Sequence, residues 1–107
     1  MKDESFPKSI RIRKKEEFEE VLKKGGKIEG NFLALYRFPC LDGPKFGFLV
    51  GRKIGKAVKR NRIKRVLREF FRKNKERFSS EKIVVLCKKP MDEINYNIIE
   101  KELESLI

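Results

Sequence analysis

The feature that most constrains this chain is one stretch, roughly residues 56–77, in which apolar and basic residues recur with the period of an α-helix. Its apolar members lie three and four positions apart: Ile63, Val66, Leu67, Phe70 and Phe71. This spacing places them in a single stripe, which a helix must bury against another element. The sequence therefore predicts a long helix here, packed on a sheet.

A second stripe follows the opposite side of this helix and contains no acidic residue. Its members are Asn61, Lys64, Arg65, Arg68, Arg72 and Lys75. A solvated helix face usually places Glu four residues from Lys or Arg, whereas Lys64 and Arg68 carry like charges at that distance. Arginines fixed on a helix present planar forks that match phosphate oxygens. The stripe thus favours phosphate binding over its alternative, an ordinary solvated basic face.

The net charge of the chain is concentrated in the same region. Residues 52–77 hold thirteen basic and two acidic residues, which gives +11 of the total of +12. Because a merely soluble surface would mix the two signs, this distribution indicates a polyanionic partner, either nucleic acid or an anionic membrane. No apolar run approaches the roughly 20 residues needed to span a bilayer, and residues 1–10 lack the apolar core of a signal peptide. We therefore expect a cytoplasmic protein that binds nucleic acid, with no membrane as partner. RNA is favoured over DNA because a helix-turn-helix needs a short helix ahead of the recognition helix, whereas residues 46–50 have the pattern of a strand.

The periodicities along the chain predict one domain over residues 1–107. Residues 1–14 are expected to form an irregular arm. Helices are expected over 15–24, 56–77 and from about Asp92 to the end, and strands near Ile28 and over 32–38, 45–51 and 82–88. In the last helix the inward residues should be Ile94, Ile98, Leu103 and Leu106.

The order of these elements predicts how they pair. Strands 32–38 and 45–51 flank a turn at residues 41–44, which is typical of an antiparallel hairpin. A strand, a long helix and a further strand imply a βαβ crossover with a parallel pair. The predicted fold is an α/β (α+β) sandwich, a four-stranded sheet with three helices in the order α-β-β-β-α-β-α.

The residues that commonly perform catalysis or hold metals are scarce. The chain has no histidine, and Cys40 and Cys87 lie in apolar, strand-like segments typical of buried reduced thiols. Glu69 and Glu76 stand alone among cations, so no metal site and no catalytic residue is predicted in the protein. The basic loop from Gly51 to Lys56 leads into a helix start that favours a phosphate, but it lacks the Lys-Ser/Thr of an NTP-binding loop.

Residues 53–69, KIGKAVKRNRIKRVLRE, closely resemble the signature of the bacterial ribonuclease P protein family, centred on Arg60-Asn61-Arg62. Residues 6–8, with Arg11, Arg13 and Phe18, resemble that family's N-terminal segment. Residues 47–53 resemble its strand before the signature, and residues 84–90 its last strand. The likeness covers nearly the whole chain.

The resemblance implies an accessory protein subunit of a ribonucleoprotein endoribonuclease. Members of the family assemble with a large catalytic RNA and together remove the 5′ leader of precursor tRNA. Mg²⁺ held by the RNA performs the hydrolysis, so no cofactor is bound by the protein alone. The resemblance also implies a left-handed βαβ crossover, against the usual hand. The alternative function is a ribosomal-type or other structural RNA-binding protein without a role in tRNA processing.

The resemblance also assigns residues. The set facing the catalytic RNA is Arg52, Lys53, Lys56, Arg60, Asn61, Arg62, Lys64, Arg65 and Arg68. The leader-binding set is Lys14, Phe18 and Tyr36. Spacing alone favours the core over a cleft for both Phe18 and Tyr36, because each shares an apolar face with its neighbours. Leu22 stands where members often carry a second aromatic residue, and Gly51-Arg52 where Ser-Lys is common.

Overall fold

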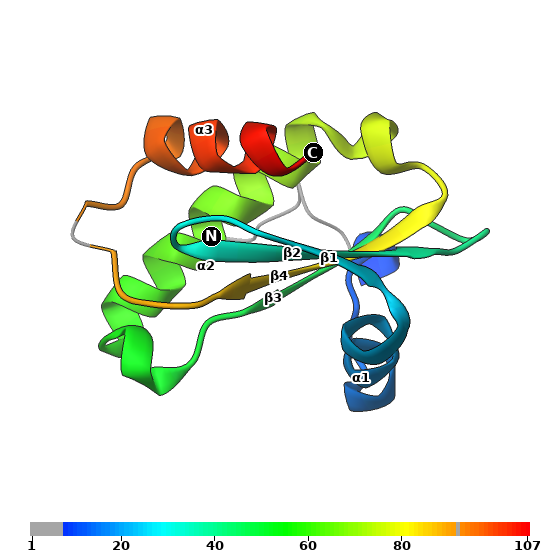
Figure 1. The fold of residues 1–107 in the computed structure, drawn as a ribbon, viewed down its shortest axis with the longest axis horizontal. Helices are drawn as coiled ribbons and strands as arrows, with labels where there is room; N and C mark the ends of the chain where they lie inside the picture. Colours follow the sequence, from blue (N-terminus) through cyan, green and yellow to red (C-terminus); the bar gives the residue numbers. More distant parts are fainter. Residues whose placement is uncertain (1–7, 92) are drawn as a thin grey trace.

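The computed structural model describes residues 8–91 and 93–107. One mixed sheet carries helix α1 on one face and helices α2 and α3 on the other (Figure 1). Across the sheet the strands run in the order β1 (Gly26–Glu29), β2 (Leu33–Pro39), β4 (Glu81–Cys87) and β3 (Lys45–Leu49). The helices are α1 (Lys15–Lys24), α2 (Ala57–Lys73) and α3 (Tyr96–Leu106), with short 3-10 helices η1 (Lys8–Ile10), η2 (Arg52–Ile54) and η3 (Lys75–Phe78). The predicted element order and sandwich are confirmed.

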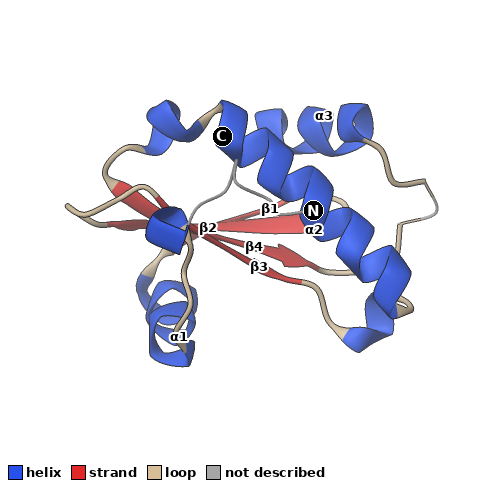
Figure 2. Ribbon diagram, turned by 180° about the vertical axis from the view of Figure 1, so that it is seen from behind, coloured by secondary structure: helices blue, strands red, loops and turns tan. Residues whose placement is uncertain are grey.

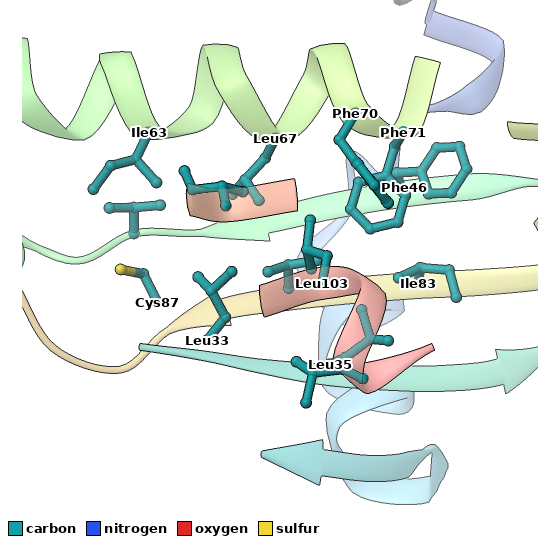
Figure 3. Close-up of a cluster of buried hydrophobic side chains, with 14 of the residues drawn as sticks. Leu33, Leu35, Phe46, Ile63, Leu67, Phe70, Phe71, Ile83, Cys87 and Leu103 are labelled. Atoms are coloured by element: carbon teal, nitrogen blue, oxygen red, sulfur yellow. The ribbon is translucent and has the colours of Figure 1, made fainter. Parts of the chain in front are cut away.

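The apolar stripe of α2 forms the centre of the main core, as predicted. Ile63, Leu67, Phe70 and Phe71 are fully buried over the sheet (Figure 3), and the partly buried Val66 packs against the same core. The ring centroid of Phe71 lies 4.9 Å from that of Phe46 on β3. Each such side chain contributes about 1.5–3 kcal/mol by leaving water. The stripe therefore fixes the rotation of α2, which lies across the sheet (Figure 2), and leaves basic residues such as Arg62 and Arg65 exposed.

The pairing of β2 with β3 as a hairpin was predicted wrongly. Strand β4 lies between them, antiparallel to β2 and parallel to β3. The physical reason lies in β4 itself, where Ile83, Val84 and Val85 are fully buried and need cover on both faces of the sheet. A central position provides that cover. The predicted βαβ unit with a parallel pair is confirmed as β3-α2-β4.

Two predicted helix boundaries also differ from the structure. Helix α2 ends at Lys73 because the Asn74 amide donates to the carbonyl of Phe70 at 2.8 Å, and η3 then turns Phe78 into the core. Helix α3 begins at Tyr96 because the side chain of Asn95 accepts the N–H of Ile98 at 3.0 Å and caps it. The expected start at Asp92 lies outside the described residues, as do residues 1–7 of the expected arm.

The buried residues of α3 are Ile99, Leu103 and Leu106. The predictions for Leu103 and Leu106 are thus confirmed. Ile94 and Ile98, which were expected to point inward, are only partly buried at the margin of the core. The difference follows from the later helix start, since Ile94 precedes the cap and Ile99 takes the inward position on the first turn.

Helix α1 covers part of the opposite sheet face. Val21 is fully buried there with Ala34, Tyr36 and Val84, in a second and smaller core. Glu17 anchors the start of the helix, because its carboxylate lies 3.3 Å from the ammonium of Lys82 on β4. The outer edge of β3 is covered by the chain before α1, where the N–H of Ile12 donates to the carbonyl of Phe46 at 2.9 Å.

Within the described residues, no helix combines the length and apolarity required to cross a membrane.

Candidate RNA interface

The basic residues assigned to RNA binding occupy one continuous region formed by η2, the following loop and the first three turns of α2. Arg52, Lys53, Lys56, Arg62 and Arg65 are exposed, as is Asn61. Arg60, Lys64 and Arg68 are partly buried at the flanks of the helix. We call this region the basic surface, defined by Arg52, Lys53, Lys56, Lys59, Arg60, Arg62, Lys64, Arg65 and Arg68.

The basic surface lacks internal counter-charges. Among residues 8–91 and 93–107, none of its cations lies within salt-bridge distance of a carboxylate. Elsewhere the pattern is the reverse, because Arg37 pairs with Glu81 and Arg77 with Glu104. A cluster of cations without carboxylate partners on the protein attracts an anionic partner that neutralises it.

The basic surface ends within α2, earlier than the sequence indicated. Glu69 accepts from Arg72 at 2.8 Å and lies 3.5 Å from the ammonium of Lys73. The hydrogen bond from Arg72 and the two positive charges lower the pKa of Glu69 and keep it ionised. Glu69 thus neutralises Arg72 from three residues away, and the basic surface stops at Arg68, where the assigned RNA-facing set also ends.

Gly55 and Arg60 fix the geometry of the loop that precedes α2. Gly55 has a φ of +152°, a backbone conformation that L side chains rarely adopt, and a side chain there would collide with Lys59. The guanidinium Nε of Arg60 donates to the carbonyl of Gly55 at 3.0 Å. Arg60 thus holds the loop against the helix while its terminal nitrogens remain at the edge of the basic surface.

A second basic region lies where the N-terminal segment meets α1 and the edge strand β3. A concavity there is lined by Lys8, Ser9, Arg11, Arg13, Lys14, Glu17 and Lys45. A smaller hollow continues from it toward α2, between Arg11, Phe18, Gly47, Lys64 and Arg68. The fold thus places the assigned residues Lys14 and Phe18 on a path that reaches the basic surface across the edge of β3.

Tyr36 does not lie on that path. It stands on β2, separated from β3 by β4, in a row of cross-strand neighbours that runs from Tyr36 through Val84 to Gly47. Its side chain is only 8% exposed and packs within the smaller core under α1. The ammonium of Lys27 on β1 lies 5.7 Å from the centre of its ring. The ring faces of Tyr36 are therefore largely occupied by protein.

The structure adds two residues that the sequence did not single out. Lys45 contributes to the basic concavity because β3 is an edge strand, which the expected hairpin would have placed inside the sheet. Gly47 lies beneath the ring of Phe18, so close that a Cβ atom would come within 2.4 Å of it. Neither contact has a signal in the sequence, because both depend on which strand occupies the edge.

The described residues offer no arrangement for metal-based chemistry. Over residues 8–91 and 93–107, no three His, Cys, Asp or Glu side chains gather as a metal site would require. The carboxylate of Glu17 is held by Lys82 and Lys45, and these charges and the hydrogen bond from Lys82 outweigh burial and lower its pKa. Cys87 is a buried thiol whose pKa is raised by burial. Glu17 and Cys87 therefore contribute to the stability of the fold.

Comparison with known proteins gives a family. A family model described as Ribonuclease P matches residues 6–107. The ribonuclease P protein component of Syntrophus aciditrophicus (strain SB) is 40% identical over 109 aligned residues, which cover 100% of this chain and 92% of the relative. That of Geobacillus kaustophilus (strain HTA426) is 39% identical and covers 90% of this chain and 82% of the relative.

Solved structures agree with the sequence comparison. The RNase P protein of Staphylococcus aureus superimposes with a TM-score of 0.79 at 29% identity, covering 92% of this chain and 93% of that one. That of Thermotoga maritima gives a TM-score of 0.77 at 28% identity, covering 90% and 93%. Matches that extend over nearly the whole length, on a chain with this strand order and this basic surface, show that the protein belongs to the ribonuclease P protein family.

Proposed function

We propose that this chain is the RNA-binding subunit of a ribonuclease P, assembling with the catalytic RNA through the basic surface. The observation that carries the proposal is the absence of carboxylate partners for that surface among the described residues, whereas Arg37, Arg72 and Arg77 each pair with a carboxylate. An RNA phosphate supplies the missing negative charge, and guanidinium forks bind it bidentately. Phosphate contacts fix the position of the protein on the RNA without recognising the base sequence. This suits a subunit that binds one folded RNA by its shape.

We assign the second basic region to the single-stranded 5′ leader of precursor tRNA. Lys14 lies in the concavity with Arg11, Arg13 and Lys45, which provides charge for leader phosphates. Phe18 is partly exposed beside it and offers an apolar ring to unpaired bases of any sequence. Because Tyr36 is mostly buried, little of its surface can contact the leader. The hollow between Phe18, Lys64 and Arg68 supports a continuous path from leader to catalytic RNA.

In this proposal the protein supplies binding and the RNA supplies chemistry. In this proposal the RNA holds the Mg²⁺ that the hydrolysis uses and the protein binds no cofactor by itself; among the described residues no three metal-binding side chains gather. Residues 1–107 act as one RNA-binding domain, and tRNA processing places the protein in the cytoplasm. The result is an endonuclease in which the protein is accessory.

The test is reconstitution with a ribonuclease P RNA transcript, followed by measurement of the affinities for precursor and mature tRNA. The protein should raise the affinity for precursor tRNA and leave that for mature tRNA unchanged, because only the precursor carries a leader. A sample of the protein without RNA should leave precursor tRNA intact. Equal effects on both tRNAs would favour a ribosomal-type RNA-binding protein instead.

Two matched substitutions locate the leader contact. Phe18→Ala should weaken precursor binding by about 1 kcal/mol, the low end for a base stacked on an aromatic ring. Leu22→Ala is the control, since Leu22 also packs partly buried against the smaller core from the same helix. It should lower stability without a leader-dependent effect. Similar losses for both variants would show that α1 acts only as a structural element.

A further inference from the structure

Three large apolar side chains are exposed among the described residues: Ile28, Leu41 and Val58. Single apolar residues on a surface are common and need no explanation by themselves. Val58 differs from the other two because it lies inside the basic surface, in the first turn of α2, with 79% of its area exposed. Lys59 follows it directly and Lys56 lies two positions before it.

Val58 forms the outer part of an apolar cleft. The cleft is lined by Lys56, Val58, Lys59, Arg62 and Ile94. Ile94 comes from the segment before α3, which lies beside the start of α2 at the same end of the molecule (Figures 1 and 2). Ile94 also contacts the main core, so the inner wall of the cleft is anchored. Two apolar side chains are thus framed by three cations.

The combination of two apolar side chains and three cations in this cleft suits an unpaired nucleotide better than a regular RNA helix. A regular RNA helix stacks its base faces inside and presents phosphates and 2′-hydroxyls, which offer nothing to an apolar side chain. An unpaired nucleotide presents phosphate and an exposed base face together, and apolar side chains pack against such faces. Lys56, Lys59 and Arg62 suit its flanking phosphates.

We propose that the Val58–Ile94 cleft receives the base of an unpaired nucleotide, a bulge or loop position of the catalytic RNA. The inference rests on the proposed function and goes beyond it, because it names the secondary structure of the RNA at the start of α2. One contact of the basic surface is then apolar and base-directed, while the others are ionic. This contact lies on the side of α2 away from the hollow between Phe18 and Lys64, so it does not belong to the leader path.

The first experiment separates the apolar contact from the ionic ones by salt dependence. The dissociation constant for a ribonuclease P RNA transcript is measured over a range of salt concentrations for the native protein and for Val58→Thr, a near-isosteric polar replacement. Binding by Val58→Thr should be about fivefold weaker at every salt concentration, with the slope of log affinity against log salt unchanged. Val58→Leu should bind like the native protein because it keeps the apolar surface.

Controls fix the interpretation. Leu41→Thr makes the same kind of change at a side chain that is 97% exposed and far from the basic surface in sequence, and it should leave affinity unchanged. Lys59→Ala should reduce the salt slope by about one, as loss of a phosphate contact does. Unchanged affinity of Val58→Thr, or an altered slope, would overturn the proposal. If the native protein itself fails to bind the RNA, the proposed function falls, which is a distinct result.

The second experiment identifies the nucleotide. A benzophenone amino acid placed at position 58 is photoactivated in the complex with the RNA, and the crosslinked nucleotide is located by reverse-transcription stops. Nuclease probing of the same RNA establishes whether that nucleotide is paired. Crosslinks to an unpaired nucleotide are expected. Crosslinks confined to base-paired stems would show that the cleft faces a helix and would refute the assignment.

Discussion

The ring of Phe18 rests directly on the backbone of Gly47, with no room for a side chain between them. A Cβ atom on Gly47 would lie 2.4 Å from one ring carbon of Phe18 and 2.7 Å from another. The absence of a side chain on the edge strand therefore determines how closely α1 approaches the sheet. It also determines where the aromatic ring stands relative to Arg11 and Lys64.

Gly47→Ala should displace Phe18 and cost about 1–3 kcal/mol of unfolding free energy through overpacking. In Phe18→Ala the same change at Gly47 should be nearly neutral, because the colliding ring is absent. A double-mutant cycle by urea unfolding measures this coupling. Additive effects of the two substitutions would show that the backbone moves to absorb the methyl group.

Tyr36→Phe should keep the fold, because Tyr36 is only 8% exposed and its ring packs in the smaller core, and it should reduce the affinity of the assembled enzyme for precursor tRNA if the Tyr36 hydroxyl contacts the leader. A lost hydrogen bond to the leader corresponds to about 1 kcal/mol. Affinities for precursor and mature tRNA, measured beside the melting temperature, test this. If neither affinity changes, Tyr36 is purely part of the core under α1 and must be withdrawn from the leader-binding set.

Arg65→Ala should weaken binding to the catalytic RNA and lower the salt slope by about one while the melting temperature stays constant. The reason is that Arg65 is exposed and has no carboxylate partner among the described residues. Arg77→Ala is the matched control, since Arg77 donates to Glu104 at 2.9 Å. It should cost at most about 1 kcal/mol of stability and leave the slope unchanged. Equal slopes for the two variants would remove Arg65 from the interface.

Glu102→Ala should destabilise the attachment of α3 to the sheet by about 1–3 kcal/mol. One carboxylate oxygen of Glu102 accepts the backbone N–H groups of Phe32 at 2.8 Å and Leu33 at 2.7 Å. Removing the acceptor leaves both donors without a protein partner. Amide hydrogen exchange at Phe32 and Leu33 should accelerate more than at Ile83. Glu102→Gln, which keeps a carbonyl acceptor, should lose less; equal losses would mean that the charge is the main contribution.

Acid should selectively weaken the anchoring of α1. The pKa of Glu17 is lowered from its ordinary 4.5 because Lys82 and Lys45 outweigh the opposing effect of burial. A lowered pKa in the folded state means that the ionised form stabilises the fold at neutral pH, and that this stabilisation is lost as pH falls below about 4.5 through the lowered value. The stability difference between the native protein and Glu17→Gln, from urea unfolding, should therefore be constant above pH 4.5 and shrink below it. A difference independent of pH would contradict the role of the charge.

Local patterns predicted most of the elements but not their arrangement in the sheet. The apolar spacing of Ile63, Leu67 and Phe70 requires one face of α2 to be buried, and the opposite face follows from it. Which strand lies beside which depends instead on burial over the whole sheet. The strands β2 and β3 are close in sequence, yet β4 separates them because its residues Val84 and Val85 need cover on both faces.

The same difference between local sequence patterns and long-range packing explains which parts of the candidate site could be predicted. The acid-free part of α2 was visible in the spacing of Lys64 and Arg68, but its limit at Glu69 depends on the rotamer that brings the carboxylate to Arg72. The resemblance supplied Phe18, while its placement over Gly47 required the edge position of β3. The assignment of individual residues to the catalytic RNA and to the leader stays a prediction, to be tested by the variants above.

Because the basic surface ends at Arg68, its part on α2 has a definite length. From Lys56 to Arg68 the helix advances twelve residues, or about 18 Å at 1.5 Å per residue. Over this span the buried stripe holds α2 against the sheet and prevents it from bending or rotating. The cations on the exposed side of α2 therefore keep fixed distances from one another. A folded RNA whose phosphates already have matching spacings can bind along this row of cations without reorganisation. A flexible strand must first lose conformational entropy. Rigidity alone therefore gives this surface a preference for structured RNA.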